Sequence, residues 1–94
     1  MCNPSYAEQE TIDIQWNVLV MMTEVCGLSY EVVLDIINKT DVLEVIRDTY
    51  WGMHQEGDHA NMWDVKDILH ARGVEIDVPP IEDIRWQRWL HQVE

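Results

Sequence analysis

Apolar and polar residues follow each other along the chain with helical spacing, and four breaks divide this pattern into five segments. The breaks lie at Gly27, Gly57, Gly73 and the pair Pro79-Pro80. Glycine and proline interrupt regular structure because glycine tolerates left-handed backbone angles and proline lacks an amide hydrogen. The pattern therefore predicts helices at about 11–26, 30–39, 42–55, 62–71 and 80–92.

The first predicted helix is apolar around most of its circumference, and its polar residues form a narrow stripe at Asp13, Asn17 and Glu24. A helix of this kind is usually central to a fold or covered by a second molecule. We therefore expect Trp16 to lie in the core, and the pattern leaves a homodimer open. Gly27 is expected to end the helix in a left-handed conformation.

The next three helices carry recognisable start signals. Ser29 is expected to cap the second helix, because its hydroxyl can accept an amide hydrogen of the first turn. Asp41 and Glu44 have the spacing of a capping box for the third helix. Asn61 is a candidate cap for the fourth helix. The second helix is clearly two-sided, with an apolar stripe at Val32, Val33, Ile36 and Ile37.

The last part of the chain differs from the rest. Residues 74–78 alternate apolar and acidic side chains, but no second strand is available to pair with them, so we interpret them as an extended connector. Pro80 suits the first position of a final helix. Short helices are not stable alone and must pack their apolar stripes together. The sequence therefore predicts one all-α domain over 1–94, a compact bundle of four to five short helices.

Length and charge exclude several classes of protein. The chain has 94 residues and a net charge of −12 at pH 7, with 18 acidic residues against six Lys and Arg. This length holds a single core, and the acidity argues against direct nucleic-acid binding. The longest apolar run, Val18 to Met22, is too short to span a membrane, and the N-terminus lacks the features of a secretory signal. We expect a cytoplasmic location and no membrane association.

The five tryptophans are the strongest indication of function. Trp51 and Trp63 fall on the polar sides of their predicted helices, and exposed tryptophan is enriched at the centres of protein interfaces. We expect these two rings to anchor a basic protein partner. The charged rim of that surface would be Glu44, Asp48, Asp64 and Asp67. Trp86 and Trp89 either pack on the body of the domain or extend the partner surface.

Catalysis and metal binding have weaker support. His54, Asp58, His59 and His70 could in principle assemble a metal site, but zinc ligands normally follow a tighter pattern and polar or capping roles are more common. The chain has no glycine-rich phosphate loop, nucleophile elbow or His-Glu-x-x-His motif. We therefore expect a protein that is not an enzyme and that needs no metal and no cofactor.

The central segment carries a series of motifs at Gly27-Leu28-Ser29, Val42-Leu43, Ile46, Tyr50, His54, Gly57, Asp64-Val65 and Leu69. From about Ile14 to Gly73 it resembles an uncharacterised family of small bacterial helical proteins, described as a domain of unknown function. Members of that family are often encoded beside proteins that look like ADP-ribosyltransferase toxins. The resemblance implies a family-like core at 11–73, followed at 74–94 by a connector and an amphipathic helix that the family lacks, and a role as a neutralising partner.

Two functions remain open at this point. The first is a non-catalytic interaction module that neutralises a basic partner, as an antitoxin does. The alternative is a phage-type acidic inhibitor that mimics nucleic acid and blocks a CRISPR or restriction nuclease. Such a mimic should display two carboxylate rows at phosphate-like spacing, whereas a toxin-neutralising protein need not.

Overall fold

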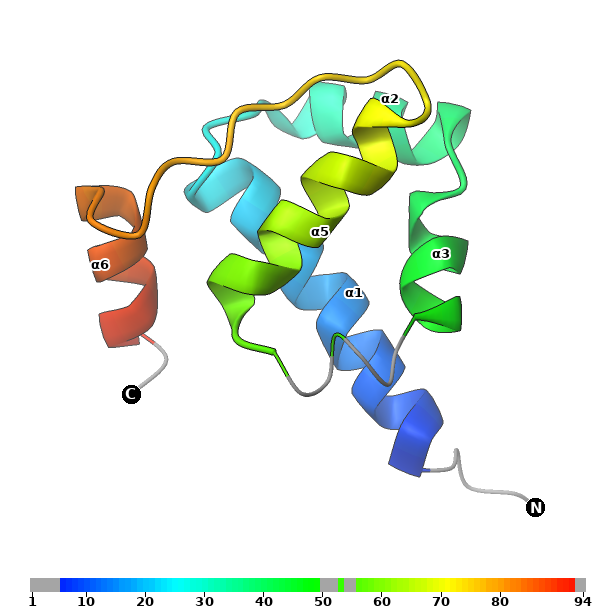
Figure 1. Ribbon diagram of the computed structural model, residues 1–94, viewed down its shortest axis with the longest axis horizontal. Coiled ribbons are helices and arrows are strands. Elements are labelled where there is room, and N and C mark those ends of the chain that lie inside the picture. The colour runs from blue at the N-terminus through cyan, green and yellow to red at the C-terminus, as the bar shows by residue number, and fades with distance from the viewer. Residues whose placement is uncertain (1–5, 50–52, 54–55, 93–94) are drawn as a thin grey trace.

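The structure is a computed structural model, and it describes residues 6–49, 53 and 56–92 (Figure 1). These residues form five helices and no strand, which confirms the predicted all-α bundle. The helices are α1 (Tyr6–Glu24), α2 (Tyr30–Lys39), α3 (Val42–Asp48), α5 (Asp58–His70) and α6 (Ile84–Gln92). No helix in the described part of the chain is both long enough and apolar enough to cross a membrane.

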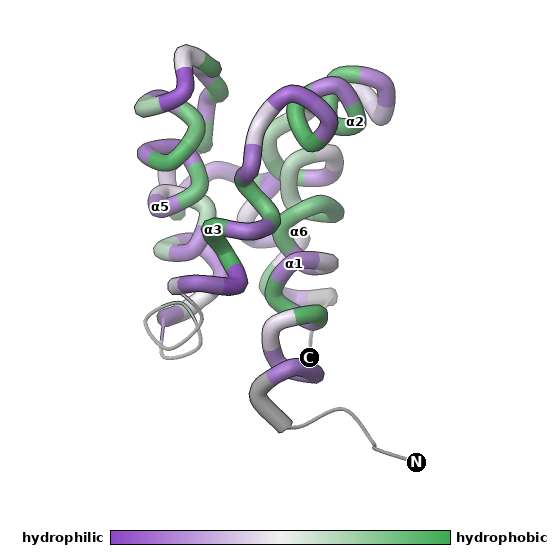
Figure 2. The backbone as a smooth tube through the Cα atoms, turned by 90° about the vertical axis from the view of Figure 1, so that its right-hand side faces the viewer, coloured by the Kyte–Doolittle hydropathy of each residue, from purple (hydrophilic) through white to green (hydrophobic). Residues whose placement is uncertain are grey.

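Helix α1 is the centre of the fold. Helices α3 and α5 pack against α1 and against each other, and α2 also packs on α1. Figure 2 shows α5 on one side of the molecule and both α1 and α2 on the other. Helix α6 lies beside the start of α5. A long connector, which crosses the top of the view in Figure 1, joins the end of α5 to α6.

The core lies between α1, α3 and α5. Val18, Met21 and Met22 on one face of α1, and Val25 directly after its end, are each at most 1 % exposed. The neighbouring helices contribute further fully buried residues, namely Val42, Ile46, Met62, Val65 and Leu69. Burying one such aliphatic side chain stabilises a fold by about 1.5–3 kcal/mol. The three helices are therefore held mainly by this shared apolar interior.

Two of the predicted helix ends and one predicted start are confirmed. Gly27 and Gly73 have φ angles of 74° and 80°, so both adopt the left-handed conformation that ends a helix. The Ser29 hydroxyl accepts a hydrogen bond from the amide of Val32 at 3.3 Å, which caps the start of α2. These signals are local, because each depends only on the backbone within a few residues.

Two other start signals are wrong. Asp41 precedes α3 but makes no side-chain cap, because its carboxylate accepts hydrogen bonds from the guanidinium of Arg72 instead. Asn61 lies inside α5, and its amide donates to the carbonyl of Gly57 at 3.0 Å. Gly57, with extended backbone angles, is the actual residue before α5, so the helix begins four residues earlier than Met62.

The bounds of the other helices also differ from the prediction. Helix α1 begins at Tyr6 rather than near residue 11, and α3 ends at Asp48 rather than near residue 55. Helix α6 begins at Ile84 rather than at Pro80. Its start is fixed by the Asp83 carboxylate, which accepts a hydrogen bond from the amide of Arg85 at 2.8 Å. A carboxylate at this position satisfies an amide of the first turn and favours the helix dipole.

The connector is extended, as predicted, and it is attached to the body along its length. Ile76 and Val78 are buried, and the ammonium of Lys66 donates to the carbonyl of Ile76 at 2.7 Å. Cys26, at the end of α1, has a free thiol. Burial raises the pKa of that thiol to about 11.

Candidate interaction surface

Trp86 and Trp89 lie in the interior, which decides between the two alternatives that the sequence left open for them. Trp86 is 0 % exposed, and its indole N–H donates to the carbonyl of Pro79 at 2.8 Å. Trp89 is 9 % exposed and donates to the Asp58 carboxylate at 2.8 Å. Trp89 joins α6 to the start of α5, and Trp86 joins it to the connector, so both rings pack on the body of the domain.

Trp63 is on the surface, as its place on the polar side of α5 predicts. Its side chain is 41 % exposed, and its indole N–H donates to the imidazole of His59 at 3.0 Å. The ammonium of Lys66 lies 5.9 Å from the ring centre, close enough for a cation–π contact. Trp63 is therefore half covered by its own helix. Trp51, the second predicted anchor, lies outside the described residues.

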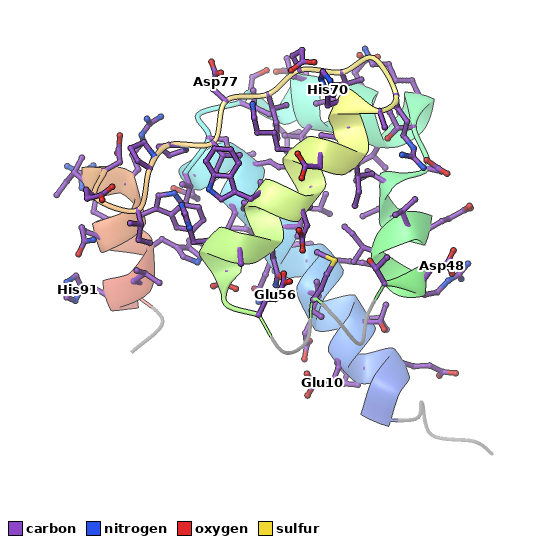
Figure 3. The ribbon with its side chains drawn as sticks, viewed as in Figure 1. Glu10, Asp48, Glu56, His70, Asp77 and His91 are labelled. Carbon is purple, nitrogen blue, oxygen red and sulfur yellow. The ribbon has the colours of Figure 1, made fainter. Side chains whose placement is uncertain are left out.

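The predicted acidic rim is divided between two helices. Glu44 and Asp48 are exposed on α3, and Figure 3 shows Asp48 at the outer edge of that helix. Asp64 and Asp67, on α5, line a hollow between α5 and the end of α3. The apolar part of this hollow is formed by Met53 and Ile68, with Thr49 beside them. Asp64 and Asp67 thus flank an apolar depression, whereas Glu44 and Asp48 do not line it.

Negative charge is concentrated near this hollow. A hydrogen bond shared with Asp64, together with desolvation and charge repulsion, raises the pKa of Glu56. Figure 3 shows Glu56 near the start of α5. Among the described residues, no Lys or Arg forms an ion pair with Glu56, Asp64 or Asp67. A cation placed here by another molecule would remove this repulsion.

The prediction that Trp16 lies in the core is wrong. Its ring is 66 % exposed, because α3 and α5 cover the opposite face of α1 and leave the Trp16 side of the helix outside the core. Ile12, one turn before Trp16, is 52 % exposed. On α2, Val32 of the predicted apolar stripe is also exposed, whereas Val33 and Ile36 are buried.

An apolar groove runs between α1 and α2, at a place where the sequence pattern did not predict a site. It holds a space of about 160 Å³ and is lined by Trp16, Leu19, Val20, Thr23, Tyr30, Val33, Leu34 and Ile37. Tyr30 is 69 % exposed. Figure 2 shows hydrophobic segments along both helices. The signal that could have found this groove is the second apolar stripe of α1, which lies opposite the stripe that forms the core.

Three of the four residues that the sequence offers for a metal site form hydrogen bonds with other side chains. Asp58 accepts a hydrogen bond from Trp89, His59 accepts one from Trp63, and His70 pairs with the carboxylate of Glu75. His54 lies outside the described residues. In the described part of the chain, no three His, Cys, Asp or Glu side chains come together in a way that could hold a metal ion.

Comparisons with protein-family models, with curated proteins and with solved structures found no match. The resemblance to small bacterial proteins encoded beside toxin-like neighbours, and the neutralising role that it implies, therefore stay hypotheses.

Proposed function

We propose that this chain is a non-catalytic protein–protein interaction module that neutralises a basic protein partner, in the manner of an antitoxin. The observation that carries the proposal is that Asp64 and Asp67 line an apolar hollow, with Glu56 hydrogen-bonded to Asp64 and no base of the described chain paired to the three carboxyl groups. A Lys or Arg side chain from a partner would place its apolar stem against Met53 and Ile68 and its charge between the carboxylates.

The total charge supports the same proposal. A net charge of −12 on 94 residues creates a negative potential that attracts basic surfaces over long distances and repels acidic ones. Charge of this kind accelerates encounter and makes association sensitive to salt. The proposal includes a cytoplasmic location, where the free thiol of Cys26 would stay reduced.

The test is purification of partners from the native host with the tagged chain, followed by stepwise release with salt. We expect a protein with an excess of Lys and Arg that is released as salt rises and whose toxicity in cells is relieved by co-expression of this chain. Recovery of only neutral or acidic proteins, or of none, would contradict the proposal.

A matched pair of variants tests the position of the charge. The double variant Asp64→Asn, Asp67→Asn should weaken partner binding by about tenfold or more, as the loss of buried charge contacts does. The double variant Asp77→Asn, Glu82→Gln changes the net charge by the same amount, at two exposed positions between α5 and α6. It should weaken partner binding only about twofold. Equal effects of the two variants would show that only the overall charge matters.

Duplex DNA as a competitor separates the alternative function. A nucleic-acid mimic occupies the DNA-binding cleft of its target, so DNA should displace it from the partner. An antitoxin-like module that covers another kind of active site should remain bound at the same ionic strength.

A further inference from the structure

Helix α1 has two apolar faces on opposite sides, and the fold covers one of them fully and the other only in part. Val18, Met21 and Met22 belong to the buried face. Ile12, Trp16 and Val20 follow each other at intervals of four residues, so they form a stripe along the other face. Helix α2 lies beside this stripe but leaves Ile12 and Trp16 mostly exposed. A stripe of large apolar side chains in water is a mark of an interaction surface.

The charged residues of the two helices that form the groove are almost all negative. Helix α1 contains four carboxylates, at Glu8, Glu10, Asp13 and Glu24, and no Lys or Arg. Helix α2 contains one base, Lys39, whose ammonium pairs with Asp35 at 3.0 Å. On the helical wheel, Asp13 lies beside Trp16 and Glu31 lies beside Leu34. The two helices that form the apolar groove thus carry an excess of negative charge.

We propose that the α1–α2 groove docks an amphipathic helix of a partner protein, with a stripe of large apolar residues flanked by Lys and Arg. This inference rests on the proposed function, because the docked helix would belong to the basic partner proposed above. The stripe from Ile12 to Thr23 covers 11 residue steps, or about 16 Å, which is the length of three helical turns. A helix laid into such a groove presents apolar anchors at positions i, i+3 or i+4, and i+7.

Charge complementarity favours this occupant over a second copy of the chain. A second copy would bring α1, with its four carboxylates and no base, against the same two negatively charged helices. It would also bring a further net charge of −12. Like charges placed across an interface disfavour association, whereas Lys and Arg flanks would face Asp13 and Glu31 with the opposite sign.

The test is a selection of displayed 16-residue peptides of random sequence on the immobilised full-length chain. We expect the enriched peptides to have helical apolar spacing and a net positive charge. Their affinities are then measured for the wild-type chain and for two variants. Trp16→Ala removes the largest ring of the groove and should weaken binding about tenfold or more. Ile84→Ala removes an exposed apolar side chain on α6, outside the groove, and should change the affinity less than about twofold.

A charge-reversed copy of the best peptide, with Lys and Arg replaced by Glu, should bind at least about tenfold more weakly. Enrichment of acidic or non-helical peptides, an absence of enrichment, or equal affinity for wild type and Trp16→Ala would overturn the inference. A dimer seen by light scattering and abolished by Trp16→Glu would assign the groove to a second copy and overturn it as well.

The inference and the proposed function can fail separately. If the host partner binds wild type and Trp16→Ala equally, the proposed function stands and the groove assignment fails. If basic helical peptides bind at Trp16 but no basic partner is recovered from the host, the groove assignment stands and the proposed function fails.

Discussion

The two faces of α1 have similar composition but very different surroundings. On one face, Met21 and Met22 are completely buried against α3 and α5. On the other, Ile12 and Trp16 keep more than half of their surface in water. Composition alone therefore does not determine which apolar face becomes core. The outcome depends on which neighbouring helices reach each face. Helices α3 and α5 pack against α1, whereas the groove on its other side is lined by residues of α1 and α2 alone.

The two tryptophans Trp86 and Trp16 give the largest expected contrast. Trp86→Ala should lower the free energy of unfolding by about 3–5 kcal/mol, because it removes a fully buried ring and its hydrogen bond to Pro79. Trp16→Ala should change it by no more than about 0.5 kcal/mol in the isolated chain. Urea unfolding followed by circular dichroism measures both. A large loss for Trp16→Ala would mean that the outer face contributes to the fold after all.

The same contrast can be made within α1 with smaller residues. Met21→Ala should destabilise the chain by about 2–5 kcal/mol, since Met21 is completely buried. Ile12→Ala, on the half-exposed side, should cost less than about 1 kcal/mol. Thermal unfolding of the two variants at equal concentration compares the faces directly. Similar losses would contradict the division of α1 into a core face and a free face.

The cap of α2 links stability to the groove. Ser29→Ala removes the hydrogen bond to the amide of Val32 and should destabilise the chain by about 0.5–2 kcal/mol. Ser29→Asn, which can also cap, should retain most of the stability. Hydrogen exchange of the α2 amides should increase in Ser29→Ala before that of α5. Uniform faster exchange in all helices would show that α2 does not open independently.

The smallest expected effect is the loss of stability at low pH. The guanidinium of Arg85 and its amide donate to Asp83 and lower the pKa of that carboxyl from 3.8 to about 2. Its stabilising contribution is therefore complete above pH 4 and is lost as the pH falls toward 2. Arg72 likewise lowers the pKa of Asp41, which acts in the same direction. The unfolding midpoint should fall with pH over this range, and less steeply in Asp83→Asn.

Some features were predictable because their causes are local. Gly27 and Gly73 end helices through their own backbone conformation, and Ser29 caps through a bond three residues away. Asp41 fails as a cap because its carboxylate binds Arg72, which lies just after the end of α5. Spacing within one helix cannot show such a contact between helices.

The candidate site was only partly predictable, for a related reason. Trp63 and the acidic residues could be assigned to polar helix faces from the sequence. The exposure of Trp16 and the burial of Trp86 depend on which helix covers which face. A Trp on an apolar stripe has the same sequence signal whether the stripe becomes core or groove.

The covered thiol of Cys26 has a consequence for covalent chemistry. With a pKa of about 11, only about one molecule in ten thousand carries the reactive thiolate at pH 7. Alkylating reagents and peroxide should therefore spare this sulfur while the chain remains folded. The rate at which the Cys26 thiol is modified would therefore measure how often the chain unfolds.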